Sequence, residues 1–283
     1  MQAAAPVAPA CGAADLHAAA LQVLRCEDPV EKCALAAAMA RALDAGELAT
    51  MASPPPIELP VPGRPPRPRL VPPRELPQRG LGSAEGRAAF LHAIAHIEFN
   101  AINLAADAVY RFRGMPLAFY RDWAGIAADE ARHFLLLQAR MAELGAAYGD
   151  FEAHNGLWDM ACRTAHDCLT RMALVPRVLE ARGLDVTPAM IKRLRGVGDE
   201  ASIAVLELIL REEVAHVAAG SRWFEWCCDR EGREPRSTFR QLLDDYAPDA
   251  VRPPFNAPAR LAAGFSADEL AGLVARSQGA RRA

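Results

Sequence analysis

The sequence lacks the features of membrane-spanning, secreted, nucleic-acid-binding and intrinsically disordered proteins. No apolar run approaches the roughly 18 residues that span a bilayer, so we expect no membrane-spanning segment and no membrane partner. No basic segment precedes an apolar one near the N-terminus, so we expect no secretory signal. The formal net charge is only -3, without the basic excess of nucleic-acid binders, which makes a nucleic-acid partner unfavoured. Hydrophobic residues make up 52% of the 283 residues, which excludes disorder of the whole chain.

The seven cysteines contain no Cys-x-x-Cys pair. An odd number of cysteines without that spacing argues against a disulfide framework and against a zinc ribbon. We therefore expect reduced thiols in a cytoplasmic protein.

Proline divides the chain unevenly. Eleven of the 22 prolines lie between Pro54 and Pro77, so residues 51–80 should form an extended connector and not a helix or a central strand. Three roles stay open for its arginines: a solvated linker, a strip along an acidic surface of the main domain, or a contact to a phosphate-bearing partner. The arginines are Arg64, Arg67, Arg69 and Arg74.

A small helical unit is predicted before this connector, in residues 1–50. A first helix covers 15–25. A second begins at Asp28-Pro29, where Asp28 caps and proline takes the first position, and stops at Gly46. Two helices bury too little surface to fold alone, so we expect them to dock on the later, larger part of the chain.

Helical periodicity dominates after Gly80, and strand signals are nearly absent. The pattern predicts long helices at 84–112, 117–144, 156–182 and 199–229. Gly183 should end the third helix, and Thr187-Pro188 should begin a short one. We predict an all-α protein: a four-helix bundle over 81–230, with the N-terminal helices and a helical extension over 231–283 packed on it.

Two of the predicted helices carry the same motif, Glu-x-x-His, as Glu130–His133 and Glu213–His216. Positions i and i+3 lie about 60° apart on a helix, so each pair projects to one face. Stepping about 100° per residue places each pair on the apolar stripe of its helix. Because burying an uncompensated carboxylate costs several kcal/mol, two such pairs facing a core favour a bound cation. Buried ion pairs with arginine are the competing interpretation, but Arg132 and Arg211 point away from the glutamates.

The other two helices each offer one carboxylate on an apolar face, Glu98 and Glu180. Glu98 precedes Glu130 by 32 residues, and Glu180 precedes Glu213 by 33, as expected of two facing helical hairpins. Two glutamates plus two Glu-x-x-His pairs form the ligand set of dinuclear carboxylate bundles. The sequence therefore predicts two metal ions, with iron preferred and manganese as the alternative. The predicted ligands are Glu98, Glu130, His133, Glu180, Glu213 and His216.

Several neighbouring residues are predicted to act outside the ligand set. His92 and His96 share a face roughly 100° or more from Glu98, which favours structural roles or the support of a metal ligand through a hydrogen bond. Pro176 should kink its helix, either opening a substrate pocket or only adjusting the packing. We expect His17 and His154 to be ordinary surface or loop histidines.

Several segments resemble the family known as domain of unknown function 455, within the ferritin-like superfamily. They include LHAIAHIEFNAINLAADAVYRF, DEARHFLLLQARMAELGAAYGDFEAHNGLW, EEVAHVAAGSRWF and PPFNAPARLAAGF. The resemblance implies a ferritin-like bundle that binds two metals, and it names no substrate. A more distant similarity links the chain to the diiron enzyme that hydroxylates a modified tRNA base.

The leading functional hypothesis is a diiron oxidoreductase that hydroxylates or desaturates a small organic molecule with O2. It would need electrons, so an electron-donor protein is an open partner, as is a second copy in a homodimer. A dimanganese catalase or peroxide scavenger uses the same ligands. Non-enzymatic iron handling and a metal-stabilised interaction protein are further alternatives. A rubrerythrin-like peroxidase is disfavoured because its Cys-x-x-Cys module is absent.

Overall fold

The computed structural model describes residues 14–51, 53–77 and 79–279, and over these the regular secondary structure is almost entirely helical. This confirms the predicted all-α class. The chain separates into two compact units. Unit 1 holds the residues up to 66 together with 98–135, and unit 2 holds 67–97 and the residues from 136 onward. Because these units cut through two long helices, the predicted division at residues 50, 80 and 230 stays a prediction.

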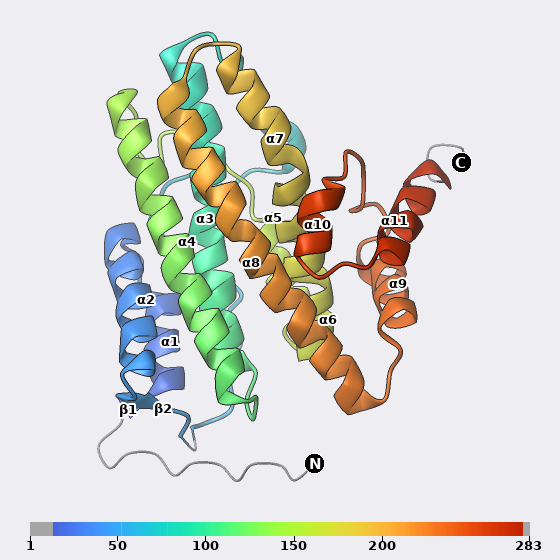
Figure 1. Cartoon of the computed structure of the whole chain (residues 1–283). Helices are drawn as coiled ribbons and strands as arrows, with labels where there is room; N and C mark the ends of the chain where they lie inside the picture. The colour runs from blue at the N-terminus through green and yellow to red at the C-terminus, as the bar shows by residue number, and fades with distance from the viewer. Residues whose placement is uncertain (1–13, 52, 78, 280–283) are drawn as a thin grey trace. The chain divides into compact units, whose positions relative to one another are not determined.

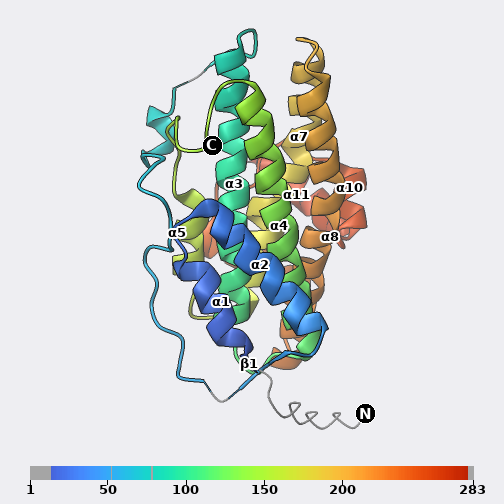
Figure 2. The same cartoon turned by 90° about the vertical axis from the view of Figure 1, so that its left-hand side faces the viewer.

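Unit 1 begins with a helical pair, α1 (Leu16–Arg25) and α2 (Pro29–Asp44), which lie side by side in both views (Figures 1 and 2). Asp28 caps α2 by accepting from the backbone N–H groups of Val30 and Glu31, as predicted. Gly46 follows the helix with a φ of +75°, which a glycine adopts without strain. A two-residue parallel ladder, β1 (Ala14–Asp15) with β2 (Leu48–Ala49), ties the ends of the pair together.

The pair docks on the Glu98–Arg111 half of α3 (Ala84–Arg111) within unit 1. Lys32 is fully buried, and its Nζ donates to Asn103 Oδ1 at 2.7 Å and to the Val23 carbonyl at 2.6 Å. The Nδ1 of His17 lies 2.9 Å from the Val109 carbonyl. The expected docking of the N-terminal helices is confirmed. The prediction that His17 is a surface residue is wrong, because its side chain fills this interface and is 3% exposed.

Unit 2 corrects the predicted helix over 156–182. Its first part, α5 (Gly156–Arg163), ends early, and Asp167 caps a separate helix, α6 (Cys168–Leu174), by accepting from Leu169 and Thr170. A π-helical turn, η2 (Val175–Glu180), then leads into α7 (Ala181–Arg195) without a break at Gly183. The short-range cap of Asp167 therefore outweighs the continuous helical pattern around it.

The prediction that Thr187-Pro188 begins a helix is also wrong, because Pro188 lies inside α7. A proline inside a helix leaves the carbonyl four residues earlier without its usual donor. Here that carbonyl belongs to Leu184, and Asn256 Nδ2 donates to it at 3.1 Å. A side chain from the C-terminal extension thus replaces the missing helical hydrogen bond.

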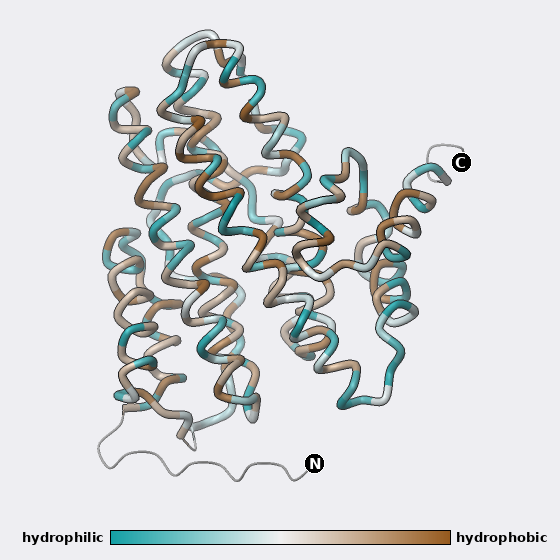
Figure 3. Tube along the Cα trace, viewed as in Figure 1, coloured by the Kyte–Doolittle hydropathy of each residue, from teal (hydrophilic) through white to brown (hydrophobic). Residues whose placement is uncertain are grey.

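The η2 turn contains Pro176, where the sequence predicted a kink. The helix responds with a local π turn, whose wider backbone accommodates the ring. Gly220 on α8 (Glu200–Glu231) faces the proline so closely that a Cβ there would lie 2.3 Å from the ring atoms. Figure 3 shows hydrophobic and hydrophilic segments alternating along α8, as expected of a helix with one buried face.

Four helices meet at one end of unit 2. Arg140, on α4 (Leu117–Glu143), donates to Asp199 at 2.9 Å, and Arg87 on α3 lies 3.1 Å from the same carboxylate. Asp199 also caps α8 through Ser202. Arg193 of α7 lies over the ring of Phe90 on α3, which brings the fourth helix to the group. This arrangement agrees with a four-helix bundle, while the ferritin-like assignment stays a prediction.

The connector and the C-terminal extension complete the fold. Within the described residues 51 and 53–77, the connector contains no helix apart from one short turn, η1 (Pro73–Glu75). In unit 2, Arg67 and Arg69 form ion pairs with Asp150 and Glu152, which supports the acidic-surface role for these two arginines. The described part of the extension is helical, as predicted, and it forms α9 (Pro235–Tyr246), α10 (Ala257–Ala262) and α11 (Ala267–Gly279).

Candidate metal centre

Unit 1 brings three of the predicted ligands together. Glu98 comes from α3, and Glu130 and His133 come one turn apart from α4. Each offers a ligand atom that lies within 4.8 Å of the other two. Their exposed fractions are 4%, 1% and 0%, so the cluster is closed to bulk water. The helical periodicity that placed these side chains on the buried face is confirmed.

The imidazole lies between the two carboxylates. His133 Nδ1 is 3.2 Å from Glu98 Oε2 and 3.4 Å from Glu130 Oε2. Burial alone would lower the pKa of His133, but the hydrogen bonds and negative charges of Glu130 and Glu98 outweigh it and raise the pKa to about 11. Without another cation, a proton on this imidazole offsets part of the carboxylate charge. A metal ion bound here would replace that proton.

Unit 2 holds the matching pair. On α8, His216 Nδ1 lies 3.3 Å from Glu213 Oε1, and the His216 side chain is buried. Glu180, the sixth predicted ligand, ends the η2 turn and is half-buried. It therefore sits on a π turn and not on the continuous α-helix that the sequence predicted. π turns are frequent at functional sites, because they reorient a side chain without ending the helix.

The donor set of the unit 1 cluster fits a transition-metal ion. Two carboxylates and one imidazole are ligand types of iron and manganese, and their spacing of a few ångströms is that of groups around a common ion. The competing interpretation as an arginine ion pair receives no support from Arg132. That side chain is 43% exposed and pairs with Asp129, whose side chain is 46% exposed, at 3.0 Å. The pair lies at the surface of α4, away from the buried face.

The remaining histidines of α3 have structural partners in unit 2, as predicted. His92 Nε2 accepts from the Gly149 N–H at 2.9 Å, and His96 Nδ1 lies 2.8 Å from the Tyr148 hydroxyl. Burial lowers the pKa of His92 to about 4, which keeps this ring neutral and able to accept. His92 and His96 therefore hold the 145–154 loop. No helix within the described ranges is both long and apolar enough to cross a bilayer.

The fold and this cluster define an all-helical protein with a buried carboxylate–histidine site. The chain belongs to the family described as "Protein of unknown function (DUF455)", whose model matches residues 25–271. A curated relative, an uncharacterised protein of Haemophilus influenzae, is 46% identical over 213 residues, which cover 73% of this chain and 74% of the relative. No solved structure matches. The family resemblance of the sequence is thus confirmed, and its ferritin-like part stays a prediction.

Proposed function

We propose that this chain is a dimetal-carboxylate protein whose ligands are Glu98, Glu130, His133, Glu180, Glu213 and His216. The observation that carries the proposal is the cluster of unit 1, where two buried glutamates and a buried histidine present ligand atoms within 4.8 Å. The Glu213–His216 pair repeats the Glu130–His133 spacing on another helix, and Glu180 precedes it at nearly the separation of Glu98 from Glu130. Each half of the set thus contributes two carboxylates and one imidazole.

The residues themselves set the charge of the site. Four carboxylates carry about four negative charges, which two divalent ions offset without help from arginine. The histidines then bind in their neutral form, and the buried carboxylates avoid the several kcal/mol that uncompensated burial would cost. Iron is the preferred occupant, and manganese uses the same ligands.

We further propose that the protein is an O2-dependent oxidoreductase. Two iron ions in this site would supply the redox chemistry with O2. Hydroxylation inserts one oxygen atom into a C–H bond of a small organic substrate and releases the other as water, consuming two electrons and two protons. An electron-donor protein would provide the electrons. The closed surroundings of Glu130 and His133 serve this chemistry because they keep bulk water from the reacting atoms.

Metal content tests the proposal directly. Protein purified from iron- and manganese-supplemented cells should contain about two metal ions per chain. With iron, reduction followed by exposure to O2 should change the absorption spectrum. With manganese and O2 release from peroxide, the catalase alternative would replace the oxygenase. Wild-type protein that carries neither metal would contradict the whole proposal.

A matched pair of variants locates the site. His133→Ala should lower the bound metal to well under half of the wild-type amount, because it removes a buried ligand. Glu143→Gln, on the same helix but paired with Arg140 at the surface, should keep the full amount. Equal metal in both variants, with both folded by circular dichroism, would show that the metal binds elsewhere.

A further inference from the structure

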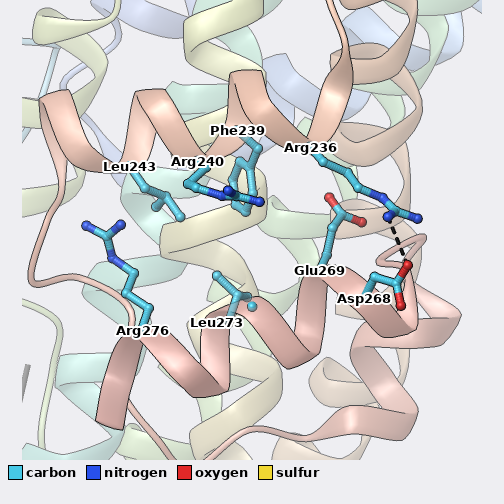
Figure 4. Close-up of a pocket in the computed structure, with 9 residues that line it drawn as sticks. Arg236, Phe239, Arg240, Leu243, Asp268, Glu269, Leu273 and Arg276 are labelled. Atoms are coloured by element: carbon cyan, nitrogen blue, oxygen red, sulfur yellow. Dashed lines mark ion pairs between the residues drawn. The ribbon is translucent and has the colours of Figure 1, made fainter. Parts of the chain in front are cut away.

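The C-terminal extension of unit 2 contains a pocket that sequence reasoning did not single out. Helices α9 and α11 enclose a pocket of about 280 Å³ (Figure 4). Its apolar lining comes from Phe239 and Leu243 of α9 and from Leu273 of α11. Arginines from both helices surround this apolar centre. The pocket is separate from every proposed metal ligand, so it does not depend on the proposed function.

Both carboxylates at the pocket already form ion pairs with arginine side chains. Asp268 pairs with Arg236 at 2.8 Å, and Glu269 pairs with the buried Arg177 at 2.6 Å. Burial would raise the pKa of Glu269, but the Arg177 charge and the hydrogen bonds from Ser266 outweigh it and lower the pKa. Glu269 is therefore ionised and held by the protein. Neither acid is left to attract a cationic ligand.

The arginines at the pocket differ in whether they form an ion pair. Arg276 pairs with Asp244 beside the pocket. Arg240, in contrast, lines the pocket with no ion pair or hydrogen bond among the described residues. Figure 4 shows its guanidinium extending from α9 beside Phe239 and between Leu243 and Arg236. An unmatched guanidinium over an apolar floor is a recognition element for a carboxylate, since it offers two parallel N–H donors.

The layer beneath the pocket adds a second, independent observation. The Arg177 side chain is 1% exposed, and its guanidinium lies 4.4 Å from the ring centre of Phe239, a residue that also lines the pocket. Two more rings, Phe224 and Phe265, lie 4.7 and 4.6 Å away. Among the described residues, its Nε and Nη1 are buried without a hydrogen-bond partner. Glu269 offsets the charge of Arg177, as Asp268 offsets Arg236 and Asp244 offsets Arg276, so the one positive charge in excess is that of Arg240.

We propose that this pocket binds a small molecule with a carboxylate head and an apolar body. The carboxylate pairs with Arg240, with Arg236 and Arg276 on either side. The apolar body packs on Phe239, Leu243 and Leu273. A volume of about 280 Å³ suits a compact ligand such as a medium-chain fatty acid.

Octanoate is the probe, and calorimetric titration of the full chain measures its binding. Arg240→Gln should weaken octanoate binding about tenfold, because it removes a charge-assisted pair. Arg195→Gln removes one exposed arginine elsewhere in unit 2 and should leave the affinity unchanged. Octan-1-ol, which has the same chain without the charge, should bind about tenfold more weakly than octanoate and should not distinguish Arg240→Gln from wild type.

A variant with a larger side chain in the pocket provides a second test of octanoate binding. A Cβ at Gly272 would meet nothing within 4 Å, and this residue lines the pocket from the middle of α11. Gly272→Leu should therefore fill the pocket and abolish octanoate binding while thermal unfolding stays at or above the wild-type temperature. The proposal fails if wild-type protein does not bind millimolar octanoate, if octan-1-ol or octylamine binds as well as octanoate, or if Gly272→Leu leaves binding intact.

Discussion

At the scale of single residues, the two lysines of the chain occupy opposite environments. Lys192 is exposed, whereas Lys32 is buried with its ammonium on the last carbonyls of α1. Those carbonyls lack helical partners, and a cation at a helix C-terminus also meets a favourable dipole. Burial lowers the pKa of Lys32 to about 8, so it remains charged at pH 7.

Replacing Lys32 should therefore destabilise the protein although methionine has a similar length. Lys32→Met leaves the Val23 carbonyl and Asn103 Oδ1 without a donor, and we expect a loss of about 1–3 kcal/mol in the free energy of unfolding. Lys192→Met should change it by less than about 0.5 kcal/mol. Urea unfolding of both variants measures the difference. Equal stabilities would mean that the Lys32 ammonium contributes nothing net.

His92 should make stability depend on pH. Its pKa is about 4 in the folded protein against 6.5 for an ordinary histidine. As the pH falls from 6.5 to 4, the His92 imidazole takes up a proton in the unfolded chain but stays largely neutral in the folded protein. The free energy of unfolding should then fall by roughly 2 kcal/mol, an effect that is absent above pH 6.5.

The His92→Gln variant isolates this effect, because a glutamine oxygen can still accept from the Gly149 N–H but does not titrate. Its stability should decline less steeply between pH 6.5 and 4 than that of wild type. His166→Gln, at an exposed position, should follow the wild-type curve. Parallel curves for His92→Gln and wild type would remove His92 as the cause.

Prediction of single residues from the sequence was correct where the face of a helix determines whether a side chain is buried. Glu98, Glu130 and His133 were found because the 3.6-residue period reports burial along one helix, and their proximity in unit 1 confirms it. The same reasoning had no means to find the carboxylate pocket. Whether Arg240 is unmatched depends on which acids its neighbours have taken, and those pairs join residues about 30 to 90 positions apart.

At the scale of helices, η2 and α8 fit each other through one glycine. Gly220→Ala should destabilise the protein by about 1–3 kcal/mol, because the new methyl would overlap the Pro176 ring. Alanine otherwise favours a helix by up to about 1 kcal/mol. Gly183→Ala in α7 meets nothing within 4 Å and should show that gain. Thermal unfolding of the two variants should shift in opposite directions; a stabilised Gly220→Ala would show that η2 yields at no cost.

The helices themselves were predictable within a residue or two where caps and periodicity agree, as in α3, α4 and α8. The prediction failed between residues 164 and 188. There the signals compete: Asp167 caps a new helix inside an apolar pattern, and Asn256 supports Pro188 from 68 residues away. Long-range support of this kind leaves no local trace in the sequence.

At the scale of the whole molecule, the proposed ligands are divided between the two units, three in each. If they form one centre, Glu130→Gln and Glu213→Gln should each remove most of the bound metal, and the double variant should lose little more. Two independent sites would instead leave about half of the metal in each single variant. Metal per chain, measured on folded protein, separates these outcomes.

The enclosure of Lys32 has a practical consequence for the molecule as a whole. Among the described residues, Lys192 near the end of α7 is the one lysine whose amine reaches solvent. An amine-reactive surface or label will therefore couple to side chains at a single known position. Coupling through that side chain attaches the protein by α7, at a residue that does not line the pocket between α9 and α11.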